Sequence, residues 1–213
     1  MRAAQEETDE VLLRRARGGE EAAFAALYRR RQAGLYRFAL QMSGSESVAE
    51  DVTQEVFMAL LDEEINFDPS RGALSSYLYG AARNQVLRRL AKERSFVALA
   101  DEDEGWQAGA DGRRGGARRH EARHDPFAEA SRSETVESVR QAVLALPVHY
   151  REVVVLCELQ EMSYADAASA LNCAVGTVRS RLHRARSLLC ERLRMFDEAE
   201  EPADDYDAAR CFA

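Results

Sequence analysis

The chain has 213 residues, of which 46% are hydrophobic and 8% aromatic, and its formal net charge is −8 at pH 7. This length and composition suit one or two small domains with apolar cores. The acidic total argues against a protein that coats nucleic acid indiscriminately, but it permits a local DNA site because salt screens charges beyond about 8 Å.

The chain carries no sign of secretion, membrane insertion or metal binding. No window reaches the roughly 18 apolar residues of a membrane helix, and the N-terminus MRAAQEETDE lacks the apolar segment of a signal peptide. We therefore expect a cytoplasmic protein without cofactor or metal, since the i,i+4 pair His120 and His124 has no cysteine or carboxylate-bearing helix to complete a metal site. The four cysteines are far apart in the sequence. We expect Cys157, Cys173 and Cys190, which lie inside helical patterns, to be buried thiols, and Cys211 lies in the C-terminal tail.

Residues 9–61 predict three helices. Apolar residues recur at helical spacing on both sides of Gly18-Gly19, which gives two helices within residues 9–43. A third is expected over about 48–61, with Ser47 as its N-terminal cap and Glu50 three residues later. Its predicted core face consists of Val48, Val52, Val56, Ala59 and Leu60.

The rest of this third helix forms an acidic surface. Asp51 and Glu55 lie off the core face together with Gln54, and Phe57 also falls outside it. An exposed aromatic ring beside carboxylates is typical of a protein-binding surface. The alternative is that the carboxylates only make the protein more soluble.

A loop over residues 62–73 precedes a fourth helix, expected over about 74–92. Its outer side interleaves aromatic rings with basic and amide groups at Tyr77, Tyr79, Arg83, Asn84 and Arg88. Rings can stack on unpaired bases while arginine holds the backbone, so this pattern favours single-stranded DNA. The alternative is that both tyrosines are half-buried core residues.

Composition then changes twice. Residues 95–133 are rich in glycine and alternating charge and predict a flexible linker between two domains. Helical patterns resume over residues 133–146 and 150–160. After Arg194 the acidic segment 197–213 predicts a disordered tail. The tail either folds back on a basic surface of the protein or is simply solvated.

Residues 163–194 predict a helix-turn-helix. Ser163 can cap the first helix, with Asp166 three residues on, and Asn172 can adopt the left-handed turn that follows Leu171. The second helix has a predicted core face of Val175, Val178, Leu182, Ala185 and Leu189.

The opposite face of this second helix is small, polar and basic. Residues 175–194 contain six arginines and one glutamate in an otherwise acidic chain. Such a face suits the major groove, where arginine bonds guanine and hydroxyls bond phosphate or bases. The candidate contact residues are Thr177, Arg179, Ser180, His183 and Arg184. The alternative is an ordinary helix pair with a solvated arginine face.

Four strings in this order resemble a known family: AEDVTQEVFMALL, SSYLYGAARNQVLRRL, LPVHYREVVVLCELQEMSYADAASAL and VGTVRSRLHRARSLL. The pattern is similar to that of the extracytoplasmic-function sigma factors of bacterial RNA polymerase. The resemblance implies an all-α protein of two small helical domains joined by a flexible linker, with the helix-turn-helix in the C-terminal one.

The resemblance also implies partners and roles. Residues 9–94 would bind the β′ clamp of core RNA polymerase through Asp51, Gln54, Glu55 and Phe57. The same domain would open the −10 element of promoter DNA, with a flipped base read by the loop at 62–73. Residues 134–196 would read the −35 element and contact the β flap, and an anti-sigma factor would hold the protein. Tyr77 stands where many members have tryptophan.

Two other functions compete with this interpretation. A stand-alone helix-turn-helix transcriptional regulator would need a dimer surface to match a two-fold operator, and no long heptad seam is present. It would also leave residues 48–92 without a role. An enzyme is not expected, because the chain has no nucleophile elbow, phosphate loop or metal cluster.

Overall fold

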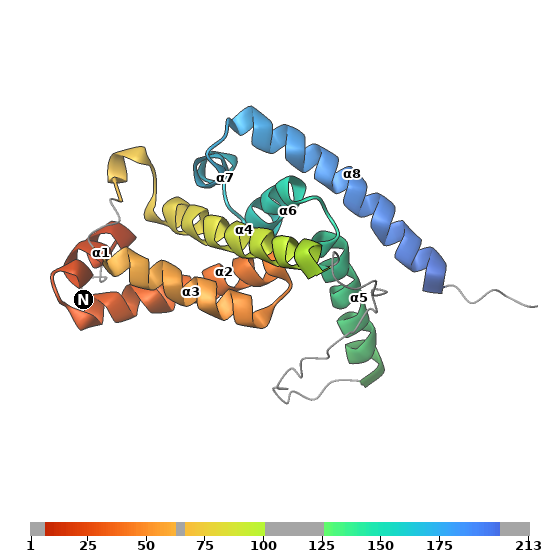
Figure 1. The fold of residues 1–213 in the computed structure, drawn as a ribbon, viewed down its shortest axis with the longest axis horizontal. Helices are drawn as coiled ribbons and strands as arrows, with labels where there is room; N and C mark the ends of the chain where they lie inside the picture. The colour runs from red at the N-terminus through yellow and green to blue at the C-terminus, as the bar shows by residue number, and fades with distance from the viewer. Residues whose placement is uncertain (1–6, 63–66, 101–125, 201–213) are drawn as a thin grey trace, which may run out of the picture.

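The computed structural model describes residues 7–62, 67–100 and 126–200, and all regular elements in these ranges are helical (Figure 1). The all-α prediction with a C-terminal helix-turn-helix is therefore confirmed. No helix in the described ranges is long and apolar enough to cross a membrane. The elements are α1 (Asp9–Arg17), α2 (Glu21–Ser43), α3 (Glu46–Leu61), the 3₁₀ turn η1 (Pro69–Arg71), α4 (Leu74–Ala100), α5 (Pro126–Leu144), α6 (Val148–Val154), the π-helical turn η2 (Val155–Leu159), α7 (Tyr164–Leu171) and α8 (Val175–Glu200).

Helices α1–α4 form what we call the N-terminal lobe. The long helix α2 packs against α1, α3 and α4. It ends at Gly44, whose φ of 76° is the left-handed conformation that glycine adopts without strain. Helix α3 begins two residues earlier than predicted, so its cap is Ser45, whose hydroxyl accepts a hydrogen bond from the Val48 N–H at 3.4 Å. The prediction of Ser47 as the cap was wrong.

The buried face of α3 is wider than predicted. Phe57 is 2% exposed, and its ring packs 4.7 Å from the ring of Tyr28 and 6.3 Å from that of Phe24, measured between centroids. The prediction of an exposed aromatic at Phe57 was wrong because α2 covers this flank of α3 as well. Met58 is the exposed apolar residue of this helix, at 60%.

Helices α5–α8 form the C-terminal lobe. Ser163 caps α7 as predicted and accepts a hydrogen bond from the Asp166 N–H at 3.1 Å. Asn172 ends α7 in the left-handed conformation, also as predicted. On α8 the central core residues Val178, Leu182 and Ala185 are buried. The ends of this face are more open, since Val175 is exposed and Leu189 is half-buried.

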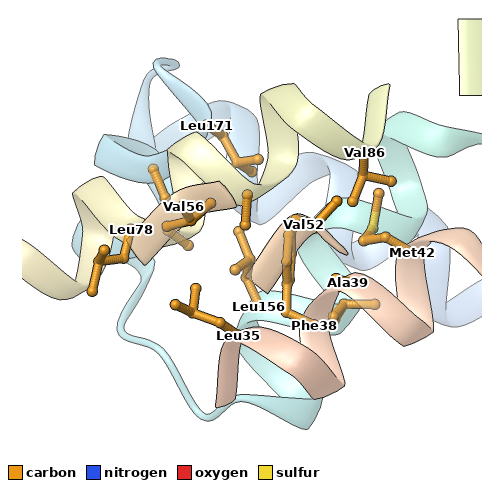
Figure 2. Packing of buried hydrophobic residues seen from close by; sticks show 14 of the residues in the cluster. Leu35, Phe38, Ala39, Met42, Val52, Val56, Leu78, Val86, Leu156 and Leu171 are labelled. Carbon is orange, nitrogen blue, oxygen red and sulfur yellow. The ribbon is translucent and has the colours of Figure 1, made fainter. Parts of the chain in front are cut away.

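The two lobes share one apolar core. Helix α4 runs between α2 and α3 on one side and α6 and α7 on the other (Figure 1). Leu156 and Leu171 of the C-terminal lobe belong to the same cluster as Leu35, Phe38 and Leu78 (Figure 2). The lobes are therefore docked against each other along α4.

Two expectations from composition, the linker and the acidic tail, need correction at their edges. The predicted linker 95–133 is helical at both ends, because α4 continues to Ala100 and α5 begins at Pro126. All five glycines of that segment lie in 101–125, which is outside the described residues. Helix α8 extends to Glu200, into the predicted tail. Residues 201–213, with Cys211, and the pair His120 and His124 also lie outside the described residues.

The cysteines are less buried than predicted. Cys157 and Cys173 are half-buried and Cys190 is exposed. Cys190 follows Leu188 and Leu189 near the end of the packed part of α8, where the helix leaves the lobe and its sides face solvent. The expectation of a buried thiol there was wrong.

Candidate functional site

The outer face of α8 presents basic and polar side chains to solvent. Arg179, Ser180, His183 and Arg184 are exposed, and Thr177 is half-buried. The structure thus places all five predicted contact residues in the first three turns of one helix, on or next to a single exposed side. A helix N-terminus of this kind can enter the major groove and offer arginine and hydroxyl groups to base edges and phosphates.

Contacts within the C-terminal lobe hold this face in position. The Arg179 guanidinium lies 5.9 Å from the ring centroid of Tyr164, at the start of α7. The Arg186 Nη2 donates to Glu158 Oε1 at 2.5 Å and ties the middle of α8 to η2. The neighbouring Glu158 carboxylate raises the pKa of the Arg186 guanidinium. The basic face of α8 is therefore held by contacts with the neighbouring helical elements α7 and η2.

Two of the five predicted residues of α4 are engaged by the other lobe. The Tyr79 ring packs 5.5 Å from that of Phe38, and its hydroxyl donates to Gln160 Oε1 at 3.2 Å. Arg83 Nε donates to Glu152 Oε1 at 2.7 Å, and Glu152 is 1% exposed. Burial raises the pKa of the Tyr79 phenol, so the hydroxyl remains a neutral donor.

The other three residues line an open cleft between the lobes. Its volume is about 980 Å³, and Tyr77, Asn84 and Arg88 of α4 form one wall. The opposite wall is the end of α7 and the turn that follows, residues 168–174. Asn84 and Arg88 are exposed, whereas Tyr77 is half-buried with its ring 5.6 Å from that of Phe67. Both tyrosines are thus half-buried, as in the alternative interpretation, and their contact with DNA stays a prediction.

The acidic face of α3 holds an arginine that the sequence pattern did not single out. Arg89 of α4 donates to Asp51 Oδ2 at 3.0 Å and to Glu55 Oε1 at 2.5 Å. Both carboxylates and Gln54 remain exposed, with Met58 beside them. Phe57 points into the core instead, so three of the four predicted residues share this surface.

Sequence reasoning missed Arg89, Met58 and Glu152. Met58 lies one helical turn from Gln54 and Glu55 and falls outside the predicted core face, but the sequence pattern gave it no role. Arg89 and Glu152 act on residues far away in the chain, and no local pattern indicates such pairs. Among the described residues, no three His, Cys, Asp or Glu side chains are grouped so that they could hold a metal ion.

Comparison with known proteins gives a consistent result. The model of sigma-70 region 2 matches residues 27–96, and that of sigma-70 region 4 matches residues 137–189. The ECF RNA polymerase sigma factor SigW of Bacillus subtilis is 30% identical, covering 85% of this chain and 95% of the relative. The ECF RNA polymerase sigma factor SigM of Mycobacterium tuberculosis is 31% identical, covering 88% of this chain and 86% of the relative.

A solved structure has a similar fold. It is that of CnrH in complex with the cytosolic domain of CnrY, with a TM-score of 0.63 at 26% identity, covering 89% of this chain and 99% of the other. The likeness spans both lobes of the chain.

Proposed function

Because the chain belongs to the extracytoplasmic-function sigma factors of RNA polymerase, we propose that its two lobes divide promoter recognition between them. Proteins of this family direct core RNA polymerase to specific promoters and start transcription there. Residues 134–196 read the −35 element, and residues 9–94 bind the polymerase clamp and open the −10 element. The observation that carries this proposal is the pairing of a solvent-exposed basic helix face with a separate aromatic and basic cleft.

The −35 element is read by α8. Arg179, Ser180, His183 and Arg184 all face solvent from consecutive turns, so they can enter a major groove without rearrangement of the lobe. Arginine paired with guanine is the most common specific contact in that groove. Thr177 and the first turn of α8 add donors for the phosphate backbone.

The −10 element is held as a single strand along α4. The cleft lined by Tyr77, Asn84 and Arg88 offers one ring, one amide and one cation, which can stack on a base, hydrogen-bond its edge and neutralise a phosphate. Tyr79 and Arg83 extend this surface once the C-terminal lobe no longer covers them.

The polymerase clamp binds the acidic face of α3. Asp51, Gln54 and Glu55 supply its polar contacts, and Met58 supplies an exposed apolar one. Phe57 supports this surface from inside by packing on α2, rather than touching the clamp. The C-terminal lobe contacts the β flap.

The family and the solved relative suggest a further partner and a place of action. CnrH has been solved with the cytosolic domain of CnrY bound, and we propose that this chain, too, is held by an anti-sigma factor. A protein that works on polymerase and promoter DNA acts in the cytoplasm.

A run-off transcription assay tests the proposal. Purified protein and bacterial core polymerase are mixed with a library of promoter fragments, and specific initiation from fragments that share a −35/−10 pair is expected. A variant with Arg179→Ala and Arg184→Ala is expected to lose initiation, whereas Arg194→Ala, which removes an exposed cation farther along α8, is expected to keep it. No initiation, together with duplex DNA binding as a dimer, would instead support a stand-alone regulator.

A further inference from the structure

The surface between the lobes uses residues that promoter DNA also needs. Arg83 and Tyr79 of α4 are among the proposed −10 contacts, and both bond to the C-terminal lobe, to Glu152 and Gln160. While its Nε–H donates to the buried Glu152 carboxylate, Arg83 cannot offer that N–H to a phosphate, and its positive charge is already paired. Docking of the lobes and capture of the strand therefore compete for the same side chains.

The carboxylate of Glu152 pairs with Arg83, the cation that would otherwise be available to a phosphate of the DNA strand. It is 1% exposed and its Oε1 lies 2.7 Å from Arg83 Nε. No donor among the described residues reaches its second oxygen, Oε2. Burying a carboxylate that is only half satisfied costs free energy, and its pair with Arg83 offsets part of that cost, so losing the pair would favour separation of the lobes.

Apolar packing acts in the other direction. Leu156 and Leu171 of the C-terminal lobe are buried in the core that both lobes share (Figure 2). Separating the lobes exposes this apolar surface to water, which is unfavourable. The closed arrangement therefore reflects two opposed contributions, and a competing ligand of α4 can shift the balance.

A glycine makes this close approach possible. A Cβ atom added at Gly80 of α4 would lie 3.0 Å from the carbonyl oxygen of Ala170 in α7, and the other near atoms also belong to the Ala170 backbone. Ser76, one turn earlier, lies with its hydroxyl 3.4 Å from Asp166 Oδ1. A methyl group at position 80 would require the Ala170 backbone to shift by a few tenths of an ångström, and a larger side chain would hold α7 away from α4.

We propose that this docked arrangement is a closed state in which the C-terminal lobe covers the strand-binding face of α4, with Glu152 and Gly80 as its latch. Opening frees Arg83 and Tyr79 for single-stranded DNA. The occlusion rests on the proposed −10 role of α4, whereas the latch itself is a property of the free protein. When only a fraction of the protein is in the state that binds, the apparent affinity for the ligand is the intrinsic affinity multiplied by that fraction.

The first experiment forces the lobes apart at Gly80 and uses no DNA. Gly80→Leu adds a side chain against the Ala170 backbone, while leucine favours the helix more than glycine does. Gly176→Leu is the matched control, since an added Cβ there has no atom within 4 Å. The full-length variants are compared by small-angle X-ray scattering, and alkylation of Cys173, which lines the cleft, gives a second readout.

Gly80→Leu is expected to increase the radius of gyration and to speed the alkylation of Cys173, and Gly176→Leu is expected to change neither. Circular dichroism verifies that both variants keep their helices. A wild-type protein that is already as extended as Gly80→Leu would overturn the closed state, and so would a Gly80→Leu protein that stays compact.

A charge exchange tests the latch independently. Arg83→Glu places a carboxylate against Glu152 and is expected to open the protein, and the double variant with Arg83→Glu and Glu152→Arg is expected to close it again. Arg89→Glu is the control. This substitution makes the same charge change on α4, but Arg89 faces Asp51 and Glu55 within its own lobe. Equal scattering from Arg83→Glu and Arg89→Glu would reject Glu152 as part of the latch.

The last experiment adds DNA to the variants that have been shown to be open. The probe is a fluorescent single-stranded oligonucleotide that carries the −10 strand of a promoter found by run-off transcription. Gly80→Leu is expected to bind it about tenfold more tightly than wild type, as for a competent state populated about one time in ten. An open variant with unchanged affinity would overturn the occlusion, while failure to find any promoter would leave the scattering results intact and count against the proposed function alone.

Discussion

The two proposed DNA-binding surfaces differ in what covers them. On α8 the basic residues stand in solvent on a packed helix-turn-helix, whereas on α4 Tyr79 and Arg83 are bonded to the opposite lobe. Both helices have the same kind of outer face in sequence, with arginines and hydroxyls off an apolar stripe. An amphipathic pattern thus tells which side of a helix is polar, but not whether a second domain lies on that side.

The largest effect is expected from the ring beneath the covered surface. Phe38 is fully buried, packs against Tyr79 and belongs to the core that both lobes share. Phe38→Ala should lower the free energy of unfolding by about 3–5 kcal/mol. Urea denaturation measures it, and Met58→Ala, at a residue 60% exposed, should stay within about 0.5 kcal/mol of wild type. A similarly small loss for Phe38→Ala would show that the ring supports little.

The exposed surface should respond in binding rather than in stability. Arg184→Ala is expected to weaken duplex binding at the −35 element by about 1–3 kcal/mol, if the contact is bidentate to guanine. Its melting temperature should not change, because the side chain is exposed. Fluorescence anisotropy on a promoter duplex gives the affinity. Arg194→Ala removes one positive charge from an exposed position farther along the same helix, and equal losses in the two variants would mean that only overall charge matters.

The cap that begins the helix-turn-helix should have a moderate effect. Ser163→Ala removes the acceptor of the Asp166 N–H and should cost about 1 kcal/mol of stability. Thermal unfolding followed by circular dichroism measures the change. Ser187→Ala, at an exposed position of α8, is the control and should cost less than half as much. If both variants melt together, the cap does not limit the stability of this unit.

The smallest effect concerns the ion pair of Arg186 with Glu158, which ties the middle of α8 to η2. Burial, and then the charge of Glu158, raises the pKa of the Cys157 thiol, while Arg186 lowers it. A raised pKa means less thiolate at a given pH, so alkylation of Cys157 should accelerate at higher pH than that of a free cysteine derivative. Glu158→Gln removes a charge that disfavours the thiolate and should move the profile to lower pH. Mass spectrometry of the labelled peptide follows the rate, and an unmoved profile would leave burial as the whole cause.

Local chemistry explains which parts of the fold the sequence could predict. The caps at Ser163 and Asn172 and the central core face of α8 depend on residues within one or two turns, and they appear as predicted. Phe57 could not be placed in the same way. A helix packed on one neighbour buries a narrow stripe, but α3 is flanked by both α2 and α4, and the buried arc widens to include it.

The candidate site divides along the same line. The −35 face needed only the phase of one helix, and its residues are together on α8. The partners of Arg83 and Arg89 come from residues 69 and 34–38 positions away in the chain. Pairs at such separation arise from how helices dock, and a single sequence carries no periodic signal for them.

The ion pairs of Arg89 with Asp51 and Glu55 affect how strongly binding at α3 depends on salt concentration. A basic partner that docks on α3 meets carboxylates that already hold a guanidinium of their own chain. Association there is an exchange of one cation for another, so fewer small counterions are released than from two bare carboxylates. The affinity of such a complex would decline only gently as salt is added, and its selectivity would come from the shape of the helix face rather than from its charge.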